Sequence, residues 1–120
     1  MRIGMRPQQS DIVLVPVPFT DLSSRKRRPV IVVSSDAYNA RCTDMIVVAM
    51  TSNPTQTAWS FQIGSDDLST GRLNHPGTVR VDRIYTLSQA LAVVKFGSVS
   101  VSVLDRIRQK LVDLFRRESA

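Results

Sequence analysis

The sequence predicts a mainly β fold: a small barrel of short strands with one amphipathic helix at its C-terminal end. Short apolar segments rich in β-branched residues recur along residues 11–85 and are separated by polar turns. Short strands at such close spacing favour a small barrel over a parallel α/β sheet. Helical periodicity is clear only near the end of the chain, over residues 104–115, so a single helix is expected to cover an open face of the barrel.

The predicted strands share a short length and a high content of valine and isoleucine; they cover residues 11–19, 29–34, 44–50, 59–63 and 78–85. The first three are nearly continuous apolar runs, which is typical of strands buried on both faces. The last two alternate polar and apolar residues, with Val79 and Val81 on one face. Pro16 and Pro18 interrupt the first run, so we expect them at an edge or a bulge, because proline cannot donate to a strand ladder.

The remaining segments are predicted to be loops or turns; they cover residues 20–28, 36–43, 51–54 and 65–77. Residues 87–96 fit a strand or a turn equally well. The helix is indicated by apolar residues at spacings of three and four: Leu104, Ile107, Leu111, Leu114 and Phe115. Ser100 or Ser102 is the expected N-cap. Arg116 and Arg117 are expected in the last turn, where positive charge complements the helix dipole.

Length and composition indicate one domain over residues 11–118, preceded by residues 1–10 as a loose tail. No apolar run approaches the ~20 residues that cross a bilayer, and no signal peptide is visible, so no membrane association is expected. The single cysteine excludes an intrachain disulfide and suits the cytoplasm. The net charge of +6 favours polyanions such as nucleic acid, although a basic surface also serves solubility or meets an acidic protein.

Several enzyme classes lack their motifs here. One histidine, His75, and one cysteine cannot provide the ligand spacing of a zinc site, so no metal is expected. No phosphate-binding or dinucleotide-binding glycine motif occurs, and no cofactor is expected. A Ser-His-Asp hydrolase would depend on His75, and no motif places a serine opposite it. His75 is therefore interpreted as a loop residue, or at most as an RNA contact.

Three stretches taken in order resemble the MazF/PemK toxin family, which includes Kid. The first joins the strand over residues 11–19, through a charged loop, to Arg28-Pro29 at the start of the next strand. The second is the strand that ends in Thr51-Ser52-Asn53. The third is residues 79–84, which contain an Arg-x-Asp motif, followed by residues 97–100 at the helix start. The combination of Arg-Pro before one strand and Thr-Ser after another is fairly specific at this spacing.

The resemblance covers residues 10–116 and implies a small SH3-like barrel of the CcdB/MazF type, with about five to seven strands. It also implies a homodimer and an acidic antitoxin protein that blocks the site. The implied activity is that of a toxin: a sequence-specific, metal-independent endoribonuclease that cleaves single-stranded mRNA and inhibits translation. The ribose 2′-OH would attack the adjacent phosphate and leave a 2′,3′-cyclic phosphate. Ser10 and residues 21–25 depart from the family's glycine-containing pattern, which leaves the RNA recognition sequence open.

The resemblance assigns catalytic roles to four residues. Arg28 and Thr51 match the family's Arg-Pro and strand-end threonine, and the planar fork of arginine suits a phosphate group. Arg80 and Asp82 match the Arg-x-Asp pair that Kid-like members use as acid and base, and on a strand they share one face about 7 Å apart. Because arginine stays protonated at neutral pH, we expect Arg80 to stabilise transition-state charge. Asp82 is expected to accept the 2′-OH proton, as a base weakened by nearby arginine.

Six further residues are the expected RNA contacts: Lys26, Arg27, Ser52, Asn53, Phe61 and His75. Each candidate also has a purely structural interpretation. Arg28 can belong to a solvated basic run and Thr51 to a turn, while the Arg-x-Asp motif can form a surface ion pair. Trp59 and Phe61 can be core residues rather than platforms for stacking bases, and one of the two is expected in the core.

Two alternatives to an endoribonuclease remain. A barrel of the same fold can be a non-enzymatic toxin that binds a protein target such as gyrase, as CcdB does, because fold alone does not determine function. A basic module can also bind RNA without cleaving it. The Arg-Pro and Arg-x-Asp motifs favour the nuclease. That hypothesis requires Arg28, Thr51 and Arg80 to converge at one concave place.

Overall fold

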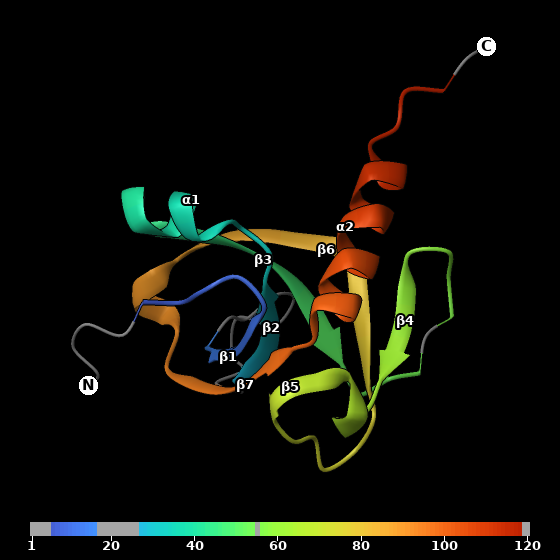
Figure 1. Cartoon of the computed structure of the whole chain (residues 1–120), viewed down its shortest axis with the longest axis horizontal. Coiled ribbons are helices and arrows are strands. Elements are labelled where there is room, and N and C mark those ends of the chain that lie inside the picture. Colours follow the sequence, from blue (N-terminus) through green and yellow to red (C-terminus); the bar gives the residue numbers. More distant parts are fainter. Residues whose placement is uncertain (1–5, 17–26, 55, 119–120) are drawn as a thin grey trace.

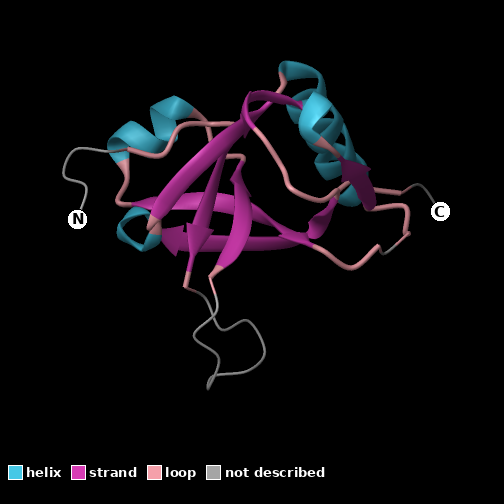
Figure 2. Ribbon diagram, turned by 90° about the horizontal axis from the view of Figure 1, so that it is seen from below, coloured by secondary structure: helices cyan, strands magenta, loops and turns pink. Residues whose placement is uncertain are grey.

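A seven-stranded antiparallel sheet forms the framework of the computed structural model, which describes residues 6–16, 27–54 and 56–118 (Figure 1). The strands are β1 (Asp11–Val15), β2 (Arg28–Val32), β3 (Asp44–Thr51), β4 (Ser60–Ile63), β5 (Leu68–Gly71), β6 (Gly77–Ser88) and β7 (Val94–Val99). Their order in the sheet is β4-β6-β3-β2-β1-β7-β5, so β4 and β5 are the edges. The sheet is strongly curled rather than flat (Figure 2), as expected for the predicted small barrel of five to seven strands.

Two helices and two short 3-10 turns complete the described chain; they are α1 (Asp36–Arg41), α2 (Val101–Leu114), η1 (Ser65–Asp67) and η2 (Gln89–Leu91). Helix α2 lies across one face of the sheet, next to β4 (Figure 1). It begins at Ser100, whose hydroxyl accepts the backbone N–H of Val103 at 3.2 Å, as expected for an N-cap. Neither helix of the described chain is long and apolar enough to span a membrane.

Each face of the sheet carries its own apolar core. The valine core, on one face, contains Val13, Val15, Val30, Val32, Met45 and Val47. The helix core, on the other face, contains Ile12, Ile31, Val48, Met50, Phe61, Ile63, Val79, Val81, Val99, Val103, Leu104 and Ile107. Because successive residues of a strand point to opposite faces, burial on both sides requires the continuous apolar runs of β1, β2 and β3.

Strand β6 bends between the two halves of the sheet. Arg80 opposes Ala49 on β3, whereas Ile84 opposes the preceding residue, Val48, so residues 81–83 have no partner on β3. Such an insertion kinks a strand and is frequent next to functional sites. The backbone N–H of Val81 donates instead to the carbonyl of Trp59 at 2.9 Å.

Two segments expected to be loops contain regular structure. Residues 36–43 include α1, which begins after Ser35, whose hydroxyl accepts the N–H of Tyr38. Six helical residues are too few to show a helical period in the sequence. Residues 65–77 include η1 and β5, and β5 pairs with β7 although only Leu68 of its four residues is partly buried. The polar composition of β5 shows no apolar alternation from which a strand could be predicted.

Two expectations near the ends of the chain also need correction. Residues 1–5 lie outside the described residues, but the remainder of the expected tail is anchored rather than loose. Ser10 donates its N–H to the carbonyl of Val32 at 2.8 Å, and the Gln9 side chain donates to the carbonyl of Val33 at 2.9 Å. At the other end, α2 stops at Leu114, so the two arginines predicted for its last turn follow the helix instead.

The proline-containing first strand is shorter than expected. It ends at Val15, so Pro16 follows the strand and does not interrupt its ladder. β1 is a central strand, paired with β2 on one side and β7 on the other, and therefore needs backbone donors on both sides. Pro18 lies outside the described residues.

The helix core predicts a clear difference between two positions on α2. Ile107→Ala removes a side chain with no exposed surface and is expected to lower the free energy of unfolding by about 2–5 kcal/mol. Val112→Ala, at a residue that is 60% exposed on the same helix, is expected to change it by less than about 0.5 kcal/mol. Urea denaturation followed by circular dichroism measures both. Equal effects would show that α2 does not pack as described.

Candidate functional site

One end of the sheet gathers the segments that were predicted to be functional. β3 ends there at Thr51 while β2 and β6 begin there, because β3 is antiparallel to both neighbours. Ser52 and Asn53 follow β3 directly, and both are exposed. His75 is exposed in the loop just before β6, at the same end. The chain thus brings together side chains that are up to about fifty positions apart in the sequence.

Arg28, Thr51 and Arg80 lie on the same face of the sheet. Residues directly opposed on neighbouring strands point to the same side, and Ala49 opposes both Val30 on β2 and Arg80 on β6. Arg28 and Thr51 each lie two residues along their strand from these partners, so alternation returns them to that side. The shared face is that of the valine core.

The separation of the two arginines follows from sheet geometry. Arg28 and Arg80 are two strands apart and about two residues apart along the strands, so their Cα atoms are separated by roughly 12 Å. Thr51 lies on the strand between them. Arg28 is exposed, Thr51 is half-buried, and the side chain of Arg80 is 17% exposed.

Arg80 and Asp82 form the ion pair that the Arg-x-Asp motif suggested. The guanidinium Nε lies 3.3 Å from one carboxylate oxygen and Nη2 lies 3.4 Å from the other. This two-point contact fixes the plane of the guanidinium, which single-point contacts do not. Because the Asp82 side chain is 33% exposed, the pair is solvent-screened and contributes little to stability. Its structural consequence is the orientation of Arg80.

The hydroxyl of Thr51 accepts one backbone hydrogen bond and can still donate one. Its Oγ1 accepts the backbone N–H of Asn53 at 3.2 Å, which closes the turn after β3. A hydroxyl that accepts still carries its own O–H donor. The turn contact predicted as the structural interpretation of Thr51 is therefore compatible with donation of its hydroxyl hydrogen to a ligand oxygen.

The other expected RNA contacts have varied positions. Arg27 is exposed immediately before β2, whereas Lys26 lies outside the described residues. Phe61 is only 6% exposed and belongs to the helix core, so its ring is not a stacking platform for a base, contrary to the expectation. It is the core aromatic of the pair, while Trp59 is half-buried. Alternation places residue 61 on the inner side of β4.

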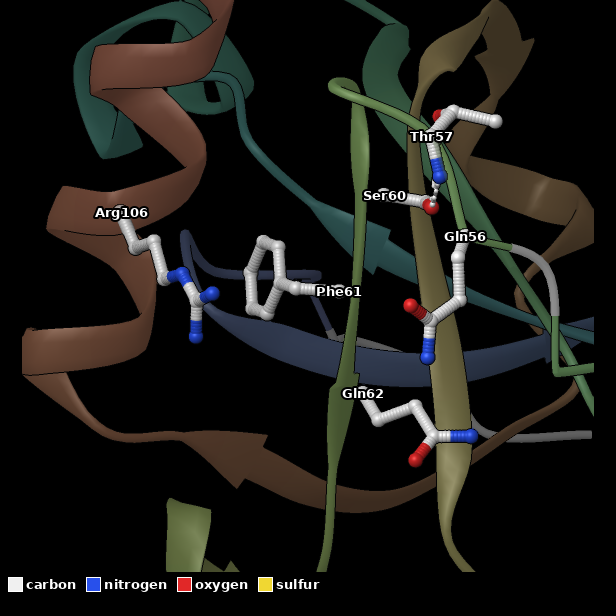
Figure 3. Close-up of a pocket in the computed structure, with 6 residues that line it drawn as sticks. All are labelled: Gln56, Thr57, Ser60, Phe61, Gln62 and Arg106. Carbon is white, nitrogen blue, oxygen red and sulfur yellow. Dashed lines mark hydrogen bonds between the residues drawn. The ribbon is translucent and has the colours of Figure 1, made fainter.

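A pocket at the outer edge of β4 was not anticipated from the sequence. It has a volume of about 250 Å³ and is lined by Gln56, Thr57, Ser60, Phe61, Gln62 and Arg106 (Figure 3). Ser60 directly opposes Arg80, so the pocket adjoins the arginine site.

Within the described residues, no three His, Cys, Asp or Glu side chains gather in a group that could hold a metal ion. The polar groups at this end of the sheet are two guanidinium groups, a hydroxyl, a carboxylate and an exposed amide. A guanidinium held by a carboxylate, beside a second arginine and a hydroxyl donor, is suited to bind a phosphodiester and to stabilise charge that develops on it.

A sequence model of the PemK-like, MazF-like toxins of type II toxin–antitoxin systems matches residues 8–115. A Mycobacterium tuberculosis protein named Endoribonuclease MazF6 is 37% identical over 95 residues, which cover 74% of this chain and 81% of that protein. A Mycobacterium bovis protein named Endoribonuclease MazF2 matches to the same extent, 37% over 95 residues. The start of the match at residue 8 agrees with the anchoring of the segment before β1.

Solved structures with the same fold are also found. An endoribonuclease from a mycobacterial species, in complex with its cognate antitoxin, superposes with a TM-score of 0.74 at 19% identity, covering 93% of this chain and 99% of that one. A MazE–MazF structure from Deinococcus radiodurans gives a TM-score of 0.73 at 20% identity, covering 96% and 100%. At these identities the superpositions establish the fold, and they confirm the predicted barrel with its C-terminal helix.

Proposed function

This chain belongs to the family of PemK-like, MazF-like toxins of type II toxin–antitoxin systems, and from that premise we propose that it is a toxin that cleaves single-stranded RNA. The observation that carries the proposal is the placement of Arg28, Thr51 and Arg80 on one face at one end of the sheet. The relatives named endoribonucleases, at 37% identity over 95 residues, support the same activity. The excess of basic residues, +6 in net charge, favours a polyanionic substrate.

We propose that cleavage proceeds by attack of the ribose 2′-OH on the adjacent phosphorus. The bond from the 2′ oxygen to phosphorus forms, the bond to the 5′ oxygen of the next nucleotide breaks, and a 2′,3′-cyclic phosphate remains. Negative charge accumulates on the nonbridging oxygens in the transition state. Arg28 and Arg80 stabilise that charge with guanidinium N–H donors, and Thr51 donates its hydroxyl hydrogen to a phosphate oxygen. These groups supply the positive charge that the reaction needs, so we propose that no metal ion is required.

Asp82 has two tasks in this proposal. It holds the plane of the Arg80 guanidinium through contacts of 3.3 and 3.4 Å. It also accepts the proton of the attacking 2′-OH, since a carboxylate oxygen that accepts from one donor retains a further lone pair. The leaving 5′ oxygen takes a proton from water. Binding of the RNA in an in-line geometry provides a further part of the rate.

The exposed residues around these groups are proposed to bind the RNA strand. Ser52 and Asn53 follow Thr51, Arg27 precedes Arg28, and His75 lies at the same end of the sheet. Lys26 is proposed as a further contact from the sequence alone. Loops of this kind suit single-stranded RNA, whose bases can be splayed apart and read individually.

An acidic antitoxin protein is the proposed partner of the toxin. The solved structures of similar fold include complexes of an endoribonuclease with its cognate antitoxin and of MazF with MazE. A negatively charged partner complements the +6 charge of this chain and competes with RNA for the same groups. A homodimer and a cytoplasmic location, where mRNA is available, complete the proposal. Neither a gyrase-binding toxin nor an RNA-binding module without cleavage is favoured by the named relatives.

Loss of Arg28 tests the arginine site directly. In excess EDTA, the parent chain is expected to cut a long single-stranded RNA at defined positions. Arg28→Ala is expected to lower kcat/KM by about 10²–10³, as for loss of one transition-state donor. Arg41→Ala removes the same charge from an exposed position on α1 and is expected to change kcat/KM only a few-fold. Intact RNA with the parent chain, over varied sequences, would contradict the proposed activity.

Removal of one 2′ oxygen from the substrate tests which group attacks the phosphorus. An RNA with 2′-deoxyribose only at the nucleotide 5′ of the cut is expected to bind normally and to resist cleavage, since its attacking group is missing. Mass spectrometry of the all-ribose products is expected to show a 2′,3′-cyclic phosphate. Cleavage of the deoxy substrate at the same bond would show that water, and not the ribose, attacks.

One variant distinguishes proton acceptance by Asp82 from its orientation of the Arg80 guanidinium. Asp82→Asn keeps an acceptor for the Arg80 guanidinium but cannot accept a proton, so kcat/KM is expected to fall by about 10²–10⁴. Asp105→Asn removes one carboxylate from an exposed ion pair on α2 and serves as the matched control. Single-turnover cleavage rates measure both. Near-parental activity of Asp82→Asn would show that Asp82 only orients Arg80.

A further inference from the structure

The pocket at the outer edge of β4, called the β4 groove, is lined from both faces of the sheet. Phe61 and Arg106 lie on the side of the helix core. Figure 3 shows Gln56, Ser60 and Gln62 on the opposite side of the strand. Because side chains of both faces line it and β4 is an edge strand, the groove lies beside the backbone of β4, where a further strand would pair.

The backbone groups of Gln62 point outward into this groove. Trp59 continues the β4–β6 register opposite Val81, and its carbonyl accepts the N–H of Val81 at 2.9 Å. Hydrogen-bonded and non-hydrogen-bonded pairs alternate along an antiparallel ladder, so Gln62 and its partner Thr78 form a non-hydrogen-bonded pair. The N–H and C=O of Gln62 are therefore directed away from β6, toward a strand added at the edge.

The accessible part of this edge is short. Before it, the Ser60 N–H donates to the carbonyl of Thr57 at 3.3 Å. After it, the Gly64 N–H donates to the carboxylate of Asp67 at 2.8 Å. Internal bonds of this kind protect a sheet edge from pairing along its whole length. They leave Gln62 at the centre of the opening, which suits a short peptide segment rather than another sheet.

Positive charge flanks the groove on the side of the helix. The Cζ atom of Arg106 lies 4.1 Å from the centroid of the Phe61 ring, which holds the guanidinium in place. Arg106 is exposed, and none of the ion pairs among the described residues includes it. The Lys110 ammonium donates to the carbonyl of Ala58 at 2.8 Å and brings a second cation to the turn before β4. A carboxylate in the groove would complement this charge.

The opposite side of the groove leads to the arginine site. A residue paired with Gln62 in an added strand points its side chain to the same face as Gln62. That face carries Arg80, which opposes Ser60 across the β4–β6 ladder. The added strand lies two strand spacings from β6, or about 10 Å, so its side chains on this face obstruct the approach of RNA to Arg80 from the β4 side. Its neighbouring residues point to the side of Arg106.

We propose that the β4 groove binds an acidic segment of the antitoxin as an additional, extended strand. One residue of the segment exchanges two backbone hydrogen bonds with Gln62, and the neighbouring residues place carboxylates at Arg106. A peptide backbone supplies both the donor and the acceptor that the outward groups of Gln62 require. This inference rests on the proposed function, which supplies an acidic antitoxin, and adds to it the place and the mode of docking.

The test selects the occupant and then measures its affinity. Random short peptides displayed on phage are selected for binding to the whole chain, and the selected peptides are synthesised with a fluorescent label. They are expected to carry aspartate or glutamate at alternate positions. In fluorescence anisotropy, Arg106→Gln and Gln62→Pro are each expected to raise Kd about 10-fold. Proline removes the outward N–H, and an edge strand tolerates it where that N–H faces solvent.

Matched controls separate these effects from charge and from side-chain loss. Arg108→Gln removes the same charge from an exposed position of α2 outside the groove. Gln62→Ala removes the amide side chain and keeps the backbone N–H. Both are expected to bind the peptides with nearly the parental Kd. Hydrogen exchange of the parent chain gives a measurement that needs no variant, because the Gln62 amide is expected to exchange more slowly when the peptide is bound.

The inference is overturned if the selected peptides lack alternating acidic residues, or if they bind Arg106→Gln and Gln62→Pro as tightly as the parent. Loss of a dimer in Gln62→Pro would identify a second copy of this chain as the occupant. Weaker binding of RNA with unchanged binding of peptides would identify RNA, and either result also overturns the inference. Peptide binding needs no cleavage, so RNA that stays intact with the parent chain contradicts the proposed function alone.

Discussion

The pairing of β3 with both β2 and β6 is the constraint on which the rest of the structure depends. Ala49 sits between Val30 and Arg80, and this register places Arg28, Thr51 and Arg80 on one side of the sheet. A slip of one residue in either ladder would turn one arginine to the opposite face. The register is itself enforced by burial, because the residues that alternate with the site belong to the valine core or the helix core. The alternation of side chains between the two faces of the sheet therefore determines both the packing of the cores and the placement of the site residues.

Strand β6 contributes residues to both cores and to the site. Its residues 81–83 have no partner on β3, and the bend at this point lets Val81 remain in the helix core while Tyr85 reaches the valine core. Asp82 lies within the bend, where its carboxylate holds the Arg80 guanidinium at 3.3 and 3.4 Å. The same strand also pairs with β4, so β6 carries Arg80 and Asp82 and also holds the strand that lines the pocket at the sheet edge.

Local patterns of alternation, period or spacing predicted five of the seven strands, the C-terminal helix, a cap at Ser100 or Ser102 and the Arg80–Asp82 contact. They left residues 87–96, where β7 begins, undecided between strand and turn. They missed α1 and β5, which are too short or too polar to produce such a pattern. Phe61 was expected to contact RNA but lies in the helix core, because the four residues of β4 do not reveal which face is inward. The pocket at the edge of β4 could not be predicted for a different reason: Arg106 contacts Phe61 only through tertiary packing.

A double-mutant cycle at the two arginines measures most directly whether they act on one phosphate. Arg28→Ala, Arg80→Ala and the double variant are compared by single-turnover cleavage of the same RNA, after confirmation that all are folded. Groups that stabilise one transition state together are strongly non-additive, so the double variant is expected to be hardly slower than the slower single variant. Losses that multiply, as for independent sites, would contradict the convergence of Arg28 and Arg80 and with it the proposed cleavage site.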